Sequence, residues 1–137
     1  MITILTLLSL NYMTRDPSIR VVLLPKDTNK HGTIFGGIIL SYIDLAGIIE
    51  ISRRTDQKVV TVLIKEVIFK YPVYVGEIVS FYCNITKIGK TSISLHVDVE
   101  VEKNFKSNLV TQADLTYCAV DNNGKPEPIV LKYEPEK

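Results

Sequence analysis

The residue of this chain best placed to do chemistry is Asp44, because it interrupts an apolar segment. The surrounding stretch, IILSYIDLAGIIEI, runs from Ile38 to Ile51, and nearly all of its other residues are apolar. A carboxylate buried without partners is costly, so Asp44 must be paired or hydrogen-bonded. Two interpretations stay open at this point. Asp44 is either a reactive group or a structural aspartate that backbone groups or a neighbouring chain satisfy.

The loop before this segment carries groups that complement a carboxylate in acyl chemistry. Gly32, Gly36 and Gly37 allow a ligand's backbone or carbonyl to come close. The first N–H groups of a helix that begins there lack acceptors within the helix and lie at the positive end of its dipole, so they would stabilise an oxyanion. Asn29 adds a neutral amide that can orient a water or a carbonyl. Together with Asp44, these groups suffice for acyl transfer to water.

A helical wheel surrounds Asp44 with small side chains. Its neighbours on the same face are residues 37, 40, 41, 47 and 48, of which Gly37, Ser41 and Gly47 are small. A packed core face would favour larger side chains. We therefore expect a ligand, or the backbone of another subunit, to approach this face.

Hydrophobic periodicity indicates the elements that position these residues. The apolar segment is too long for a typical strand, and it predicts a helix that opens at Gly36-Gly37 and runs to about Ser52. Because this helix is apolar on nearly all sides, we expect it to be enclosed. Strands are predicted around it at Ile19–Leu24, Lys58–Lys70, Glu77–Ile88, Thr91–Glu102 and Leu109–Val120.

This order of elements predicts an α+β fold in which an antiparallel β-sheet curls around one long central helix. The four strands after the helix are expected to form a meander, and the domain is expected to span residues 19–121. Residues 1–18 form an N-terminal extension of uncertain structure, either an additional strand or a leader upstream of Met13. Residues 122–137 form a proline-rich, charged C-terminal tail that we expect to be frayed. Open sheet edges favour pairing with a second copy, so at least a dimer is expected.

Composition argues against several kinds of partner. A chain of 137 residues suits one domain, and a formal net charge of +1 without a basic stripe argues against nucleic acid. The apolar N-terminal stretch is too short to cross a membrane. Two cysteines, Cys83 and Cys118, are too few for a disulfide framework, and with two histidines beside them they do not predict a metal site. Reduced thiols suit a cytoplasmic location.

The stretch DTNKHGTIFGGIILSYIDLAG resembles the signature of hot-dog-fold acyl-CoA thioesterases, in particular the bacterial YciA-type group. The matching positions are Asn29, Gly32, Gly36-Gly37 and Asp44-Leu45-Ala46-Gly47. The similarity continues through VVTVLIKEVIFKYPVYVGE and IGKTSISLHVDVE, and so covers roughly residues 20–120. Several separated blocks agree in order, which makes the resemblance more specific than a single glycine motif.

The resemblance implies hydrolysis of an acyl-CoA thioester to the free acid and coenzyme A. It implies that Asp44 is the general base or nucleophile and that Asn29 positions the water or the carbonyl. The N–H of Gly37, or of a residue beside it, would polarise the thioester carbonyl. The resemblance implies no cofactor, since coenzyme A is part of the substrate. The residues expected to contact substrate or CoA are His31, Gly36, Lys90, Thr91, Ser92 and Arg54.

Active sites in this family form at a dimer interface, and dimers commonly assemble into hexamers, so a homodimer with shared sites and a trimer of dimers are expected here. The alternative is a non-catalytic acyl-CoA binding or sensing module on the same fold. A hot-dog dehydratase would need a catalytic histidine on the loop, where His31 is the candidate, but the surrounding pattern resembles the thioesterases more closely. Plainer interpretations also exist for two residues: His31 as a solvated loop residue, and Arg54 as a cap of the helix end.

Overall fold

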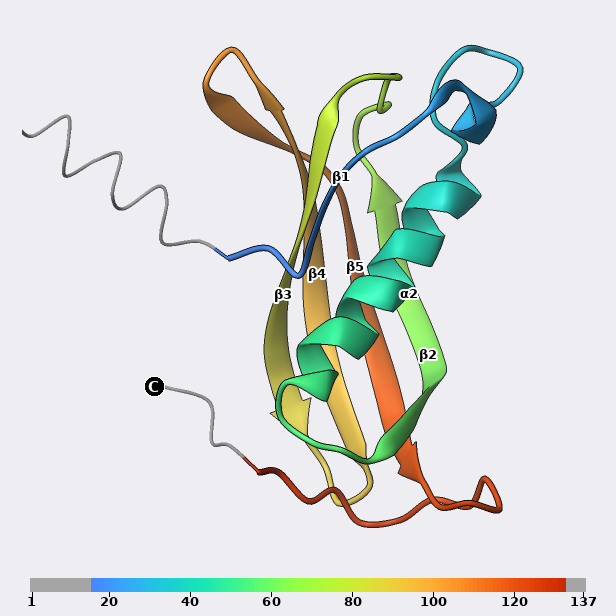
Figure 1. Cartoon of the computed structure of the whole chain (residues 1–137), viewed down its shortest axis with the longest axis vertical. Helices are drawn as coiled ribbons and strands as arrows, with labels where there is room; N and C mark the ends of the chain where they lie inside the picture. Colours follow the sequence, from blue (N-terminus) through green and yellow to red (C-terminus); the bar gives the residue numbers. More distant parts are fainter. Residues whose placement is uncertain (1–15, 133–137) are drawn as a thin grey trace, which may run out of the picture.

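One antiparallel sheet and one long helix make up the computed structural model, which describes residues 16–132 (Figure 1). A short 3-10 helix, η1 (Pro25–Asp27), precedes the long helix α2 (Gly36–Ser52). The predicted N-terminal extension therefore lies outside the described residues except for positions 16–18. The strands are β1 (Ile19–Val22), β2 (Lys58–Phe69), β3 (Ile78–Ile88), β4 (Ser92–Lys103) and β5 (Lys106–Val120).

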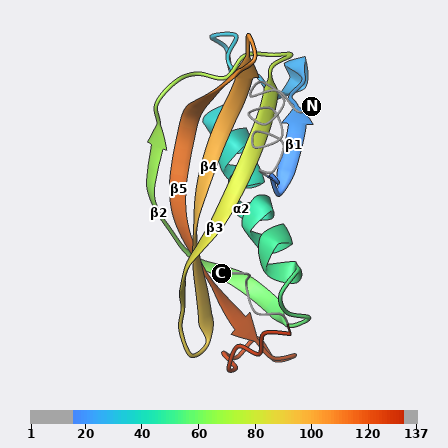
Figure 2. The same ribbon diagram turned by 90° about the vertical axis from the view of Figure 1, so that its left-hand side faces the viewer.

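The strands lie in the order β1-β3-β4-β5-β2, and every neighbouring pair is antiparallel. Figure 2 shows β2 at one edge of the sheet and β1 at the other. The predicted four-strand meander is therefore wrong for β2, which pairs with β5 instead of β3. The reason lies in the connections. Tight turns join β3 to β4 and β4 to β5. Residues 70–77 instead leave the sheet after β2 and lead the chain to β3, which lies beside β1. On the way, the carbonyl of Val73 accepts the N–H of Ile34 at 2.8 Å.

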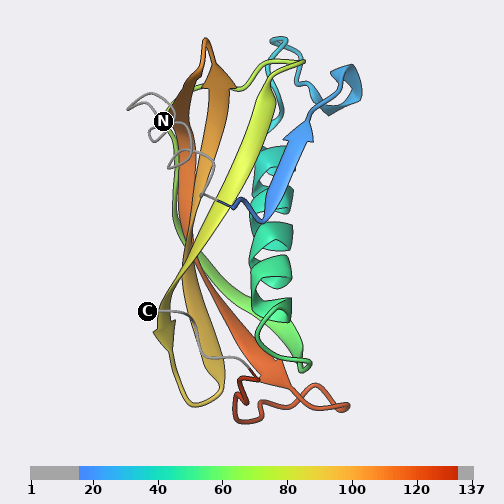
Figure 3. The same cartoon turned by 60° about the vertical axis from the view of Figure 1, so that its left-hand side comes forward.

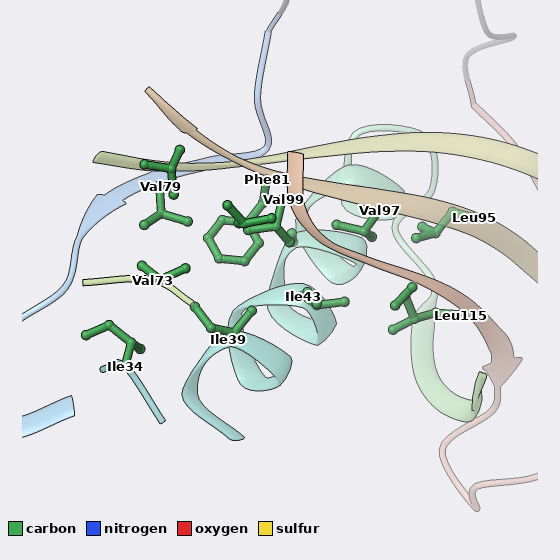
Figure 4. Packing of buried hydrophobic residues seen from close by; sticks show 14 of the residues in the cluster. Ile34, Ile39, Ile43, Val73, Val79, Phe81, Leu95, Val97, Val99 and Leu115 are labelled. Atoms are coloured by element: carbon green, nitrogen blue, oxygen red, sulfur yellow. The ribbon is translucent and has the colours of Figure 1, made fainter. Parts of the chain in front are cut away.

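Helix α2 begins and ends where the apolar segment predicts, and it packs along one face of the curled sheet (Figure 3). Ile39, Ile43 and Ile51 are buried against the sheet. The strands meet them with the inward residues of their alternating pattern. Figure 4 shows this core, including Val79, Phe81, Leu95, Val97, Val99 and Leu115.

The expectation of an enclosed helix is wrong within a single chain. Ser41 and Leu45 are exposed on the side of α2 away from the sheet, and Leu45 remains 48% exposed. The sheet covers one face of the helix, and no other element among residues 16–132 covers the opposite face (Figure 3). Apolar residues on this uncovered side are a feature of a surface that another molecule covers.

The edge strand β2 is irregular and apolar on its exposed side. Its register with β5 shifts between Thr61 and Leu63 and again between Lys65 and Ile68. Glu66, in the second irregularity, has a φ of 54°, in the left-handed region. The exposed apolar side chains of this strand are Val60, Val62, Leu63, Ile68 and Phe69. The other edge strand, β1, is four residues long.

The C-terminal tail is attached to the domain as far as Lys132, so the expectation of a frayed tail is wrong for residues 122–132. The N–H of Ile129 bonds the carbonyl of Lys90 at 2.9 Å, and the N–H of Lys132 bonds the carbonyl of Arg54 at 2.7 Å. Ile129 and Leu131 also pack against the core. The tail thus connects the β3–β4 turn to the end of α2. Within residues 16–132 no helix is long and apolar enough to span a bilayer.

Candidate functional site

Asp44 lies half-buried in the middle of α2, and side chains from two strands contact it. The Thr61 hydroxyl of β2 donates to Asp44 Oδ1 at 2.7 Å. The Tyr117 hydroxyl of β5 lies 3.1 Å from the same Oδ1 and 2.7 Å from the backbone carbonyl oxygen of Asp44. Among residues 16–132, Oδ2 has no hydrogen-bond partner. One carboxylate oxygen is therefore fixed by donors, and the other remains available.

The surroundings of Asp44 combine a held carboxylate with an uncovered surface. Thr61 belongs to the edge strand β2, and its neighbours in sequence, Val60 and Val62, are exposed. Leu45, next to Asp44 on the helix, is exposed as well. The donors from Thr61 and Tyr117 meet the requirement that a sheltered carboxylate be hydrogen-bonded. The carboxylate is nevertheless not sealed in the core, because it lies beside an open, apolar edge of the sheet.

The small side chains around Asp44 have a different cause from the one expected. A Cβ atom on Gly47 would lie 2.1 Å from the Tyr117 hydroxyl, so Gly47 makes room for a tyrosine of its own chain. A Cβ atom on Gly37 would lie 2.6 Å from the ring of Phe35. The expectation that a ligand or another subunit fills the space is therefore wrong at Gly47. Ser41 is exposed, and its hydroxyl donates to the Gly37 carbonyl at 2.8 Å.

Tyr117 is the functional candidate that sequence reasoning missed. Its side chain is fully buried, and burial raises the pKa of its hydroxyl well above the ordinary value. The negative charge of Asp44 raises this pKa further. The hydroxyl therefore stays protonated and acts as a donor. The signal in the sequence was a tyrosine on the inward face of the last strand, because a buried hydroxyl needs a partner. The contact of Thr61 with Asp44 was also not predicted from the sequence.

The loop that carries Asn29 is held by the Asn29 side chain itself. Asn29 Oδ1 accepts the N–H of His31 at 2.8 Å and the N–H of Thr33 at 3.3 Å. Asn29 Nδ2 donates to the Thr33 hydroxyl at 2.9 Å. The amide thus shapes the loop, and the second hydrogen of Nδ2 has no acceptor within residues 16–132. His31 is exposed at the tip of this loop.

The start of α2 faces an apolar groove. The ring of Phe69 lies 3.5 Å from where a Cβ atom of Gly36 would be, so a side chain there would narrow the gap to β2. A groove of about 310 Å³ opens at this point. Its lining includes Ile34, Gly36, Ile39, Phe69, Tyr71 and Thr111.

Asp44 and the first N–H groups of α2 are too far apart to serve the same carbonyl within one chain. Gly37 and Asp44 are separated by two helical turns, which is about 10 Å along the axis. A reacting carbonyl must lie about 3 Å from both the catalytic group and the oxyanion donor. Side chains lean toward the helix start, but this closes only part of the gap. The predicted catalytic residues therefore do not form a complete site in a single chain.

The residues predicted to contact CoA are also divided between the two ends of α2. Lys90 lies in the exposed β3–β4 turn, at the end of the sheet opposite the start of α2 (Figure 1). Thr91 and Ser92 belong to this turn and to the start of β4, and the Ser92 carbonyl accepts the N–H of Gly89 at 2.8 Å. His31 and Gly36 lie at the opposite end, in the loop and at the first residue of α2.

Arg54 follows the end of α2, where its guanidinium caps the helix. Its Nη1 lies 2.7 Å from Glu50 Oε1 and donates to the Glu50 carbonyl at 2.9 Å, so the capping interpretation is confirmed. A groove of about 500 Å³ runs from Arg54 along residues 83–88 of β3.

Three further titratable side chains make no hydrogen bond to Asp44: His96, Cys83 and Cys118. His96, on the outer face of β4, has Nδ1 at 2.7 Å from Asp114 and Nε2 at 2.9 Å from Asp98. Cys83 and Cys118 are unpaired thiols, and burial raises the pKa of Cys83 to about 11. No cluster of three or more potential metal ligands occurs in the described part of the chain.

Comparisons with known proteins show what the chain is similar to. The model of the thioesterase superfamily matches residues 31–106. The acyl-CoA thioester hydrolase YciA of Salmonella typhimurium is 38% identical over 119 residues, which cover 83% of this chain and 90% of that protein. The structure of Cj0915, a hexameric hotdog fold thioesterase of Campylobacter jejuni, is similar with 41% identity and a TM-score of 0.75, covering 84% of this chain and 90% of that one. The hexameric thioesterase y2039 from Yersinia pestis is similar with 36% identity and a TM-score of 0.80, covering 88% of this chain and 98% of that one.

Proposed function

The chain belongs to the thioesterase superfamily, and we propose that it hydrolyses acyl-CoA thioesters to the free acid and coenzyme A through Asp44. The observation that carries this proposal is the asymmetry of the carboxylate. Thr61 and Tyr117 hold Oδ1, whereas Oδ2 has no partner within residues 16–132. Asp44 is only half-buried, and its Oδ2 is not among the buried atoms that lack a partner, so this oxygen is open to water or substrate. Asp44 thus presents an oxygen beside an open, apolar edge.

The carboxylate supports two routes to the same products. As a general base, Oδ2 takes a proton from water while the water oxygen bonds to the thioester carbonyl carbon. The tetrahedral intermediate then expels the CoA thiolate, which receives a proton. As a nucleophile, Oδ2 itself bonds to the carbonyl carbon and expels the thiolate, and water hydrolyses the resulting anhydride. Both routes develop negative charge on the carbonyl oxygen, and both need donors for that oxygen.

We propose that a second copy of the chain supplies these donors. The Gly37 N–H and Asn29 lie near the start of α2, about 10 Å along the helix axis from Asp44 of the same chain. Pairing of β2 with β2 of a second copy would cover the exposed Val60, Val62 and Leu63. It would also bring the partner's loop toward Asp44. This arrangement gives a homodimer with two shared sites, in which Asn29 positions the water or the carbonyl.

We propose that CoA extends from this site along residues that lie near the two ends of α2. Lys90 is exposed in the β3–β4 turn and would meet a phosphate, with Thr91 and Ser92 beside it. His31 and Gly36 would contact substrate at the opposite end. Arg54 already pairs with Glu50, so a phosphate contact from Arg54 would have to compete with that ion pair. The two similar solved proteins are hexameric, which supports a trimer of dimers here. A cytoplasmic location stays a prediction from the reduced thiols.

The test is release of free thiol from acyl-CoA substrates of increasing chain length by the purified protein and by Asp44→Asn. Asparagine keeps the size of the side chain but cannot accept the proton or attack the carbonyl. We expect kcat to fall at least about a hundredfold. The matched control is Asp56→Asn, which alters an exposed carboxylate outside the site and should leave turnover unchanged.

Equal turnover by wild type and Asp44→Asn would remove Asp44 from the mechanism. Tight binding of acyl-CoA without hydrolysis of any substrate would instead identify a binding module. The same substrates also report the preferred chain length.

A further inference from the structure

We infer that Tyr117 is a positioning residue for Asp44, and that it leaves Oδ2 as the carboxylate oxygen that meets the substrate. This inference rests on the proposed function, because a positioning role requires a reaction at Asp44. Tyr117 comes from β5, which is far from the helix in sequence. Its hydroxyl reaches Asp44 across a separation of 73 residues. No group on α2 itself makes this contact.

The Tyr117 hydroxyl has one hydrogen and shares it between two oxygens of the same residue. It lies 2.7 Å from the backbone carbonyl oxygen of Asp44 and 3.1 Å from Oδ1. The carbonyl is fixed in the helix, so the hydroxyl is fixed relative to the helix, and the side-chain oxygen is fixed relative to both. Thr61 adds a second donor to Oδ1 at 2.7 Å, from the neighbouring strand β2, where it is the register partner of Tyr117. Donors from two neighbouring strands thus hold Oδ1, and Oδ2 is the oxygen that is left without a donor among residues 16–132.

The helix carries a glycine where the tyrosine approaches. A Cβ atom on Gly47 would lie 2.1 Å from the Tyr117 hydroxyl oxygen, 2.6 Å from Cζ and 2.8 Å from Cε2. Glycine is among the poorest residues for a helix interior, so its presence one turn after Asp44 is unfavourable for α2 alone. The close approach explains it. Gly47 lets a polar ring tip pass the helix backbone and reach Asp44.

A purely structural role for Tyr117 makes different predictions. In that case the hydroxyl needs an acceptor only because it is buried, and the backbone carbonyl alone would satisfy it. Removing the hydroxyl would then lower stability and leave the reaction unchanged. The two roles therefore separate when the rate of catalysis is measured on folded protein.

The first experiment compares Tyr117→Phe with wild type in the thiol-release assay, with the substrate range that wild type turns over. Phenylalanine fills the same space and removes only the donor. Thr61 still holds Oδ1, so we expect a partial loss, with kcat about tenfold lower and KM within about twofold of wild type. The matched control is Tyr42→Phe, on the same helix as Asp44. The ring of Tyr42 packs against Phe81, so removing its hydroxyl should leave kcat and KM unchanged. Thermal unfolding of each variant verifies that the protein is folded at the assay temperature.

The second experiment is a double-mutant cycle with Gly47→Ala. The added methyl group displaces the Tyr117 ring, so Gly47→Ala should lower kcat at least as much as Tyr117→Phe. In the Tyr117→Phe background the methyl group still meets the ring carbons Cζ and Cε2, but no hydroxyl contact to Asp44 is left to lose, so the same change should lower kcat by a smaller factor. Strict additivity of the two effects on kcat would contradict a shared cause.

The outcomes distinguish this inference from the proposed function. If wild type hydrolyses acyl-CoA and Asp44→Asn does not, but Tyr117→Phe keeps the wild-type kcat, Tyr117 is a structural residue and the inference is overturned alone. If wild type hydrolyses no thioester, or Asp44→Asn is as active as wild type, the proposed function fails and the inference fails with it. A fall in kcat at constant KM, absent in Tyr42→Phe, supports the inference.

Discussion

Phe105 offers a quantitative test of the fold, because its backbone is strained and its side chain is fully exposed. It lies with Asn104 in the two-residue turn between β4 and β5, where Lys103 pairs with Lys106. Both turn residues have a positive φ, 53° for Asn104 and 60° for Phe105. Asparagine tolerates this region, whereas a phenylalanine there is unusual. The Phe105 side chain is 101% exposed, so replacing it removes no packing.

The expected effect of Phe105→Gly is the difference between two terms. Relief of the left-handed conformation contributes about 1–2 kcal/mol to the free energy of unfolding. The greater freedom of glycine in the unfolded chain removes about 0.4–1 kcal/mol. The midpoints of the two ranges differ by about 0.8 kcal/mol, so we expect a net stabilisation of that amount, which raises Tm by about 2–4 °C for a domain of this size.

Scanning calorimetry of wild type, Phe105→Gly and Phe105→Ala measures this effect. The alanine variant removes the ring but keeps the Cβ atom, so it should show little of the gain. All three proteins are compared at equal chain concentration, because assembly adds to apparent stability by mass action. A Tm of Phe105→Gly at or below that of wild type would refute the reasoning.

Two further predictions concern the outer face of the sheet and its edge. For His96, burial lowers the pKa, but the hydrogen bonds and charges of Asp114 and Asp98 raise it by more, so it lies above 6.5 in the folded protein. The stabilising contribution of His96 is therefore complete below its unfolded pKa and is lost as the pH rises through its folded pKa. The difference in unfolding free energy between wild type and His96→Gln, measured by urea denaturation, should therefore shrink as the pH rises above 6.5. A pH-independent difference would contradict this. For the edge, Val62→Lys places a charge on a β2 side chain that is 57% exposed, so it should shift the protein toward monomers in analytical ultracentrifugation and lower turnover at least about tenfold. Val130→Lys, in the tail at 63% exposure, is its control, and an unchanged mass for Val62→Lys would argue against pairing through β2.

Local patterns in the sequence predicted the elements well. The length and apolar character of the segment around Asp44 gave the bounds of α2, because no proline and no cluster of turn formers interrupts it before Arg53. Strict alternation gave the inward face of β4, where Ile93, Leu95 and Val97 are buried. These predictions succeed because each depends on residues that are neighbours along the chain.

Pairings between distant segments were not predictable in the same way. Alternation shows which side chains of β2 point inward but not which strand lies beside it, and the pairing of β2 with β5 was missed. The partners of Asp44 were missed for the same reason, since Thr61 and Tyr117 lie 17 and 73 residues away. The small size of Gly47 was noticed, but its cause, a tyrosine of the same chain, required the fold.

The helix showed a further limit. Its apolar outer side led to the expectation of an enclosed helix, yet Leu45 is exposed in the single chain. An apolar side chain in the sequence indicates burial in the oligomer as well as in the single chain, and it does not indicate which chain buries it. Asn29 was selected for a catalytic role, and the structure adds that its amide also builds the loop.

The two bends in β2 restrict what can align against this strand. A straight, flat edge offers the same template to any extended peptide, including a misfolded one, and so invites fibril growth. An edge bent after Thr61 and again after Lys65 matches best with a strand bent at the same places. A second copy of the same sequence, turned end for end, meets that condition. Such a match closes on itself, so the irregular strand favours a finite particle over an endless stack.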